Sequence, residues 1–233
     1  MNRKGGKNTK TKILLVSLND ARINNSCYIP IYYNLFKFGG IFNIVEHDLI
    51  WIKGEKMNTL ETLYSRKSIR NFNGENITEE ELKEILKAAY ASPVGRAKYD
   101  TLNLTVITNE DILNEWEQTM AKMVGNPEMR PFYGAPTVIL VSSEIQNPQM
   151  SNVNYSNAAI IVHNMAIAAT ELGVGACHIW GAIGTLMDNL ELRNKLKIPK
   201  KMVPCCAIAL GHTNEKYSIR EIPKNRISTD YIK

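Results

Sequence analysis

Beyond the first quarter of the chain, apolar and polar positions alternate with the periods of helices and strands. Asn58 is placed to cap a short helix. Thr78 and Glu81 form a capping box at the start of a second helix, whose apolar positions recur at helical spacing until Pro93. The pattern predicts further helices over 109–123, 155–172 and 186–196, and strands over 102–108, 137–143, 176–180 and 202–211.

Two of these segments lack a polar face. The run TVILVSS over 137–143 is typical of a strand that is buried on both faces. The helix over 155–172 is apolar nearly all round, which indicates a central, buried helix. His163 within it is expected to be a satisfied core residue, with a ligand as the alternative. Residues 212–233 are polar and follow no period. Since the sequence shows no internal repeat, residues 57–233 predict one α+β domain.

The first 56 residues differ from the rest of the chain. They are rich in Asn, Lys, Ile and Tyr, and their apolar runs are too short or too interrupted for a signal peptide or a membrane span. They end in KGEKM over 53–57, whose Lys-Gly-Glu codons can form a purine-rich ribosome-binding site just before the Met57 codon. We therefore expect Met57 to be the true start. The alternative is a real, poorly packed extension, and in either case we expect no chemistry from it.

The charge distribution excludes one class of partner. The chain has a formal net charge of +5, but residues 1–56 carry this excess, with 9 Lys or Arg against 4 Asp or Glu. Residues 57–233 are neutral and offer no footprint for nucleic acid. The 4 cysteines form no CxxC pair and no zinc spacing, so we expect no metal and a reducing, cytoplasmic location without membrane contact.

Two basic clusters lie at opposite ends of this neutral domain. The first is SRKSIRNF over 65–72, in which guanidinium groups and the Ser68 hydroxyl can bind phosphate oxygens. The second is the pair Lys224 and Arg226 in the aperiodic tail. Each cluster alone is equally consistent with a solvated charged turn. Together the two clusters can close on one phosphate.

Five motifs in order over residues 57–233 resemble the nitroreductase family of FMN-dependent oxidoreductases. They are the basic run R-K-S-I-R-N-F, A-S-P-V-G after a helix, Y-G-A-P before a strand, L-G-V-G-A after the long helix, and P-K-N-R near the end. The resemblance implies an α+β fold with a mixed sheet flanked by helices, and an intertwined homodimer with one FMN in each of two interface sites.

The same resemblance implies roles for individual residues. The phosphate and ribityl binders would be Arg66, Lys67, Ser68 and Arg70, joined by Lys224 and Arg226. The backbone along the isoalloxazine ring would come from Pro93, Val94 and Gly95 on one side and from Ile179, Trp180 and Gly181 on the other. Hydride would pass from NADH or NADPH to flavin N5 and then to a nitroaromatic, a quinone or a similar small-molecule acceptor in a ping-pong cycle, so no side chain is expected to be catalytic.

The chain also departs from the family pattern. Residues 96–102 replace the Asn-x-Gln-Pro-Trp run of many members, and Trp180 stands where some relatives carry Glu. Phe132 and Tyr133, on a loop without an evident packing need, are candidates for substrate contact. A reductive dehalogenase-like enzyme with another acceptor and a non-catalytic FMN-binding or storage protein remain as alternatives. The sequence leaves open the physiological acceptor, the nicotinamide preference and one-electron against two-electron reduction.

Three further patterns are weaker. The Gly173 to Gly175 stretch lies between a helix and a strand, the reverse of a Rossmann fingerprint. Cys177 and His178 are adjacent on a predicted strand, where neighbouring side chains point to opposite faces. They are therefore not expected to act as nucleophile and base. Cys205 and Cys206 lie inside a predicted core strand and are expected to be buried.

Overall fold

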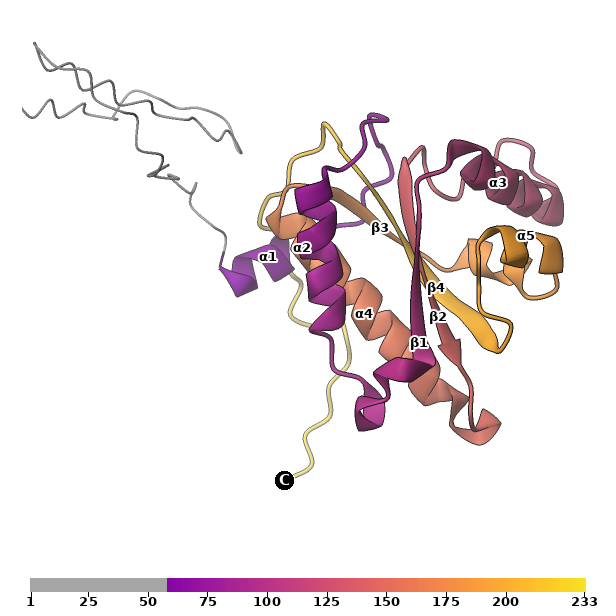
Figure 1. The fold of residues 1–233 in the computed structure, drawn as a ribbon. Helices are drawn as coiled ribbons and strands as arrows, with labels where there is room; N and C mark the ends of the chain where they lie inside the picture. Colours follow the sequence, from indigo (N-terminus) through magenta and orange to yellow (C-terminus); the bar gives the residue numbers. More distant parts are fainter. Residues whose placement is uncertain (1–57) are drawn as a thin grey trace, which may run out of the picture. The chain divides into compact units, whose positions relative to one another are not determined.

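A four-stranded sheet forms the middle layer of residues 58–233, the part of the chain that the computed structural model describes (Figure 1). Its spatial order is β1-β2-β4-β3, and all three pairings are antiparallel. The strands are β1 (Leu102–Ile107), β2 (Thr137–Glu144), β3 (Gly175–Ile179) and β4 (Met202–Gly211). The α+β class is confirmed. The sheet is not the mixed one that the resemblance implied. Strands β2 and β3 run in the same direction, but β4 lies between them and pairs with each of them antiparallel.

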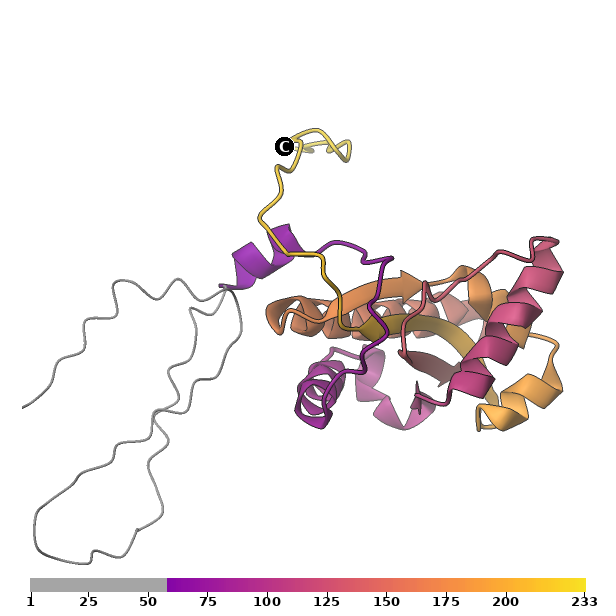
Figure 2. The same ribbon diagram turned by 90° about the horizontal axis from the view of Figure 1, so that it is seen from above.

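Helices cover both faces of the sheet (Figures 1 and 2). On one face lie α2 (Glu79–Tyr90) and α4 (Ser151–Glu171), and on the other lie α3 (Glu110–Val124) and α5 (Leu190–Lys195). The short helix α1 (Thr59–Ser65) precedes them. Four 3-10 turns complete the regular structure of the described residues: η1 (Gly95–Ala97), η2 (Tyr99–Thr101), η3 (Pro148–Met150) and η4 (Gly181–Leu186).

Two helix starts follow predicted caps, and a third lies where the predicted range 109–123 begins. Asn58 and Thr78 each close a capping box, with Glu61 and Glu81 as the acidic partners. The side chain of Asn109 accepts a hydrogen bond from the backbone of Ile112 at 3.0 Å and begins α3. Side-chain oxygens at these positions satisfy amide groups that have no partner within the helix. The local pattern therefore set these three boundaries correctly.

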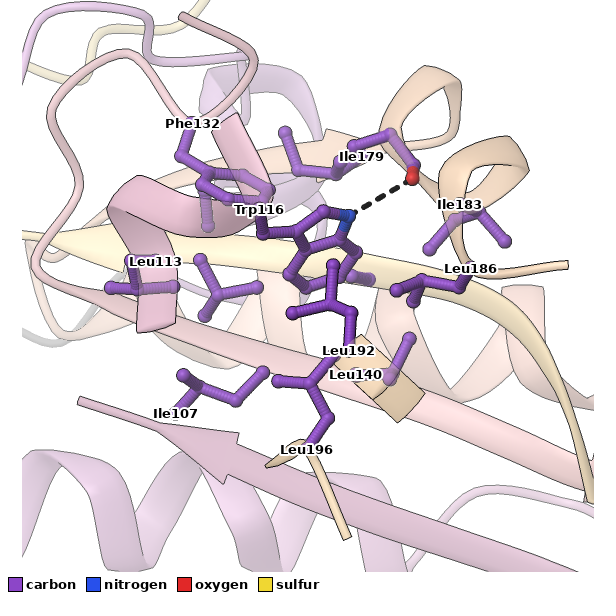
Figure 3. Close-up of a cluster of buried hydrophobic side chains, with 14 of the residues drawn as sticks. Ile107, Leu113, Trp116, Phe132, Leu140, Ile179, Ile183, Leu186, Leu192 and Leu196 are labelled. Atoms are coloured by element: carbon purple, nitrogen blue, oxygen red, sulfur yellow. Dashed lines mark hydrogen bonds between the residues drawn. The ribbon is translucent and has the colours of Figure 1, made fainter. Parts of the chain in front are cut away.

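Strand β2 is buried on both faces, as its continuous apolar run predicted. Val138 and Leu140 pack in the core beneath α3 and α5, whereas Ile139 and Val141 pack in the core beneath α2 and α4. Figure 3 shows the first of these cores around Trp116, whose indole Nε1 donates to the carbonyl of Ala182 at 3.0 Å.

Helix α4 differs from the prediction in one respect. It begins at Ser151, and one of its sides is buried against the sheet while Tyr155, Ile160 and His163 are exposed. The expectation that His163 is a core residue is therefore wrong. An apolar helix face that this chain leaves uncovered gives the same all-apolar pattern as a helix that its own chain surrounds.

The remaining segments are less regular. The helix predicted over 186–196 is shorter in the structure: α5 begins after its cap, Asn189, and Leu186 is the last residue of η4. Residues 212–233 contain no helix or strand, as predicted. The interpretation of residues 1–56 lies outside the described residues. None of the helices within 58–233 is both long enough and apolar enough to span a membrane.

Candidate functional site

The basic run after α1 lies against the edge strand β3. The backbone amide of Ile69 donates to the carbonyl of Ala176 at 2.9 Å. This approach depends on Gly175, because a Cβ atom there would lie 2.8 Å from the carbonyl oxygen of Gly211 and 3.0 Å from Phe72. The run is thereby fixed in an extended form, and Ser68 lies within hydrogen-bonding reach of Cys177 on β3.

The C-terminal tail returns along the same run. The hydroxyl of Thr213 donates to the carbonyl of Asn71 at 2.8 Å, and the hydroxyl of Tyr217 donates to the carbonyl of Val174 at 2.8 Å. The Nε of Arg220 donates to the carbonyl of Tyr64 at 3.0 Å. Residues 213–220 are thus held by the backbone of their own chain, although they form no regular element.

These contacts bring Arg220 to the end of α1, where Arg66 lies, and Arg226 lies within electrostatic range of Arg66. Partial burial and the positive charges of Arg220 and Arg226 lower the pKa of Arg66. No carboxylate among the described residues forms a salt bridge with any of the three arginines. A cluster of like charges without a counter-charge is costly unless an anion binds there. The arrangement therefore defines a candidate anion site.

The cluster differs from the sequence expectation at two residues. The ammonium of Lys67 lies 2.6 Å from Glu215 in a salt bridge, so this cation has a partner within its own chain. Lys224 is exposed. Arg220, which the sequence reasoning missed, takes a central place. A single charge in an aperiodic tail carries no signal, and its position became evident only from its contact with Tyr64.

Two histidines lie beside the arginine cluster. The rings of His163 on α4 and His178 on β3 have centroids 5.8 Å apart. Burial and the charges of His163 and Arg66 lower the pKa of His178 to about 4. Partial desolvation and Arg66 also lower the pKa of His163. Both imidazoles are therefore neutral near pH 7 when no anion is bound.

The segment after β3 continues from His178. Ile179 is buried in the core, and Gly181 begins η4. The side chain of Trp180 is 52% exposed despite its large apolar surface. The structure therefore places an uncovered aromatic ring two residues from the histidine that adjoins Arg66, which is consistent with a surface that a planar ligand covers.

The turn over Pro93, Val94 and Gly95 lies at the end of α2. The amide of Gly95 donates to Asn157 Oδ1 of α4 at 3.1 Å. The next residues, Arg96 and Ala97, have φ of 59° and 52°, a left-handed conformation that is costly for a side chain with Cβ and is found at functional turns. Within residues 58–233, no hydrogen bond or ion pair joins this turn to the arginine cluster. Within one chain, the two sets of predicted FMN-binding residues, the turn over 93–95 and the arginine cluster, are therefore not in direct contact through such bonds.

The two aromatic candidates on the loop before β2 have different environments. Phe132 is 1% exposed and packs edge to face on Trp116 with ring centroids 4.9 Å apart, as Figure 3 shows. Its assignment to substrate contact is therefore corrected, because the α3 core supplies the packing need that the loop sequence did not reveal. Tyr133 is 38% exposed with φ of 57°, and the Arg70 guanidinium lies 5.8 Å from its ring centroid, within cation–π range.

A paired substitution tests this division of roles. Phe132→Leu should lower the free energy of unfolding by about 1 to 2.5 kcal/mol through lost packing and lost aromatic pairing. Tyr133→Leu should change it by no more than about 0.5 kcal/mol, as is usual for an exposed position. Urea denaturation of both variants measures the difference, and equal destabilisation would contradict it.

The cysteines of the described residues are structural. Cys177, Cys205 and Cys206 are buried and unpaired, and burial raises the pKa of Cys205 to about 11 and of Cys206 to about 12. Such thiols are poor nucleophiles. Across residues 58–233, the structure groups no three His, Cys, Asp or Glu side chains in a way that suits a metal ion.

The family model for the nitroreductase family matches residues 63–212, and the chain therefore belongs to this family. A nitroreductase with bound FMN from Desulfitobacterium hafniense is 26% identical, with a TM-score of 0.65 over 75% of this chain and 100% of that one. A second nitroreductase with bound FMN, from Bacteroides fragilis, has the same identity and coverage and a TM-score of 0.64. The FMN reductase (NADPH) of Bacillus subtilis is 25% identical over an alignment of 171 residues that covers 66% of this chain and 66% of that one.

Proposed function

We propose that this chain is an FMN-dependent oxidoreductase that takes hydride from NADH or NADPH and reduces nitroaromatics, quinones or similar small acceptors. The observation that carries the proposal is the cluster of Arg66, Arg220 and Arg226, which lacks a carboxylate partner among the described residues and adjoins the segment that ends in exposed Trp180. Membership of the nitroreductase family and the FMN in the Desulfitobacterium hafniense relative support it.

The chemistry of the donor groups fits FMN. Guanidinium groups bind phosphate oxygens in paired, charge-assisted hydrogen bonds, and a terminal phosphate carries the two negative charges that such a cluster needs. FAD has no terminal phosphate, so the cluster favours FMN. Ser68 and Arg70 lie on the same extended run as Arg66 and would contact the ribityl phosphate end, while the segment from Ile179 to Gly181 would line the ring.

Bound FMN supplies the hydride chemistry. The residues of the chain bind and orient it: the arginines hold its phosphate, and Trp180 excludes water from one side of the ring position. Tyr133, fixed beside Arg70, is placed to contact a planar donor or acceptor. Because both would use the same surface in turn, a ping-pong cycle follows.

A second copy of the chain would complete the site. The exposed side of α4, with Tyr155 and Ile160, is an apolar face that the described residues leave uncovered. In Figure 2 the last residues stand clear of the helices and the sheet. The turn over 93–95 is not joined to the arginine cluster of its own chain, so in a homodimer the turn of one protomer would serve the cluster of the other.

Two optical measurements test the function. The purified full-length protein should be yellow with about one FMN per chain, and NADH or NADPH should bleach that colour without oxygen. A protein that stays colourless after incubation with FMN contradicts the proposal. A yellow protein that neither nucleotide bleaches would favour FMN storage or a different electron donor.

A further inference from the structure

The histidine pair lies within the anion site. His163 projects from α4 and His178 from β3, and the Arg66 charge acts on both. No described side chain forms a hydrogen bond with either ring. The two imidazoles thus form a close pair beside a guanidinium cluster and have no hydrogen-bond partner among the described side chains. Their arrangement indicates that the two imidazoles function when a ligand is bound.

We propose that His163 and His178 are anion-binding residues that take up a proton when a phosphomonoester or a similar dianion binds beside Arg66. The proposal extends the proposed function, since the same arginines would hold the FMN phosphate. It adds two residues that the sequence resemblance did not assign, and it couples cofactor binding to protonation of the protein.

The charges around the pair explain the direction of this coupling. In the free chain, Arg66 opposes a positive charge on either imidazole, and each imidazole opposes a charge on the other. Arg220 and Arg226 add further positive charge through their proximity to Arg66. The other titratable groups that act on Arg66 are the Cys177 thiol and the Tyr217 phenol, and burial raises the pKa of both, so both are neutral near pH 7.

A bound dianion reverses this electrostatic effect on the two imidazoles. It neutralises part of the arginine charge and attracts a proton to the nearer imidazole, which then donates a hydrogen bond to an anion oxygen. Opposite charges within about 4 to 6 Å change a pKa by about one to three pH units. Because the two rings are close, only one of them is expected to carry the proton. By linkage, the anion should bind more tightly as the pH falls through this range.

Sulfate is the sharpest probe, because it remains a dianion from pH 5 to pH 8 and brings no proton of its own. The experiment follows the histidine Cε1–H resonances of the full-length, flavin-free protein by NMR, with and without sodium sulfate, from pH 5 to pH 8. His163→Gln and His178→Gln assign the signals. His212, which pairs with Glu81 at 3.0 Å away from the cluster, is an internal control.

We expect sulfate to raise the pKa of His163 or His178 by at least about one pH unit and to leave the His212 signal unchanged. Calorimetry in two buffers of different ionisation enthalpy should show net proton uptake on sulfate binding, and the double variant His163→Gln/His178→Gln should abolish it. Failure of sulfate to bind, or binding that leaves both histidine titrations unchanged, would overturn the proposal for this flavin-free form.

The FMN-loaded protein provides a second, independent readout. In that form one histidine of the pair should titrate at or above pH 6.5, even if the flavin-free chain does not fold. Both histidines titrating below the normal imidazole range in the loaded protein would overturn the proposal. A chain that binds no FMN but takes up a proton with sulfate would contradict the proposed function alone, so the two failures can be told apart.

Discussion

Arg66→Ala and Arg226→Ala should each weaken FMN binding by about 10-fold to 150-fold. This range corresponds to a charge-assisted hydrogen bond worth about 1.5 to 3 kcal/mol. Flavin fluorescence quenching measures the dissociation constant. Turnover should largely recover at saturating FMN, because these residues would contact the phosphate and not the reacting ring. The double variant should lose more than either single variant, although not additively, since both groups would contact one phosphate.

Two matched variants separate the phosphate contact from general loss of charge. Lys67→Ala also removes a cation from the basic run, but its ammonium already pairs with Glu215, so its effect on FMN affinity should be clearly smaller. Lys87→Ala removes an exposed cation of α2 that pairs with Glu84 and should have no effect. Unchanged affinity in both arginine variants would refute the anion site.

The sequence predicted those residues of the anion site that belong to short basic motifs. The basic run over 65–72 and the pair at 224 and 226 can be recognised in the sequence itself, and the structure brings Arg226 within electrostatic range of Arg66. Arg220 and the pairing of Lys67 with Glu215 depend on how the tail returns along the first basic run. Hydrogen bonds to the backbone of Tyr64, Asn71 and Val174 determine that path, and no periodicity encodes them.

The fold shows the same division. Caps and continuous apolar runs act within a few residues, so Asn58, Thr78, Asn109, β2 and β4 were predicted well. The role of Phe132 depends on Trp116, which is 16 positions away in the chain, and its burial was missed. The exposed side of α4 was missed for a related reason. Apolarity along a helix does not show whether its own chain or a partner covers it.

The tail gives the second large expected effect. A chain that ends at Arg226 should lose most of its dimerisation and, with it, most of its FMN. This truncation removes Ile227, Tyr231 and Ile232, which are 80%, 82% and 100% exposed within the described chain. Burying an isoleucine contributes about 1.5 to 3 kcal/mol, so losing two from the tail of each protomer should weaken the dimer by at least about ten-thousandfold. Sedimentation over a range of protein concentrations measures this loss.

Truncation after Arg226 separates the effect on the dimer from the effect on the arginine cluster. Residues 213–220 are held by their own chain through Thr213, Tyr217 and Arg220, so a longer deletion would damage the fold that presents Arg66. Ending at Arg226 keeps every arginine of the cluster, and loss of FMN must then follow from loss of the partner's turn over 93–95. Arg226→Ala should show the converse, an intact dimer with weakened FMN binding. A truncated chain that sediments as an FMN-loaded, active monomer would show that each protomer builds its site alone.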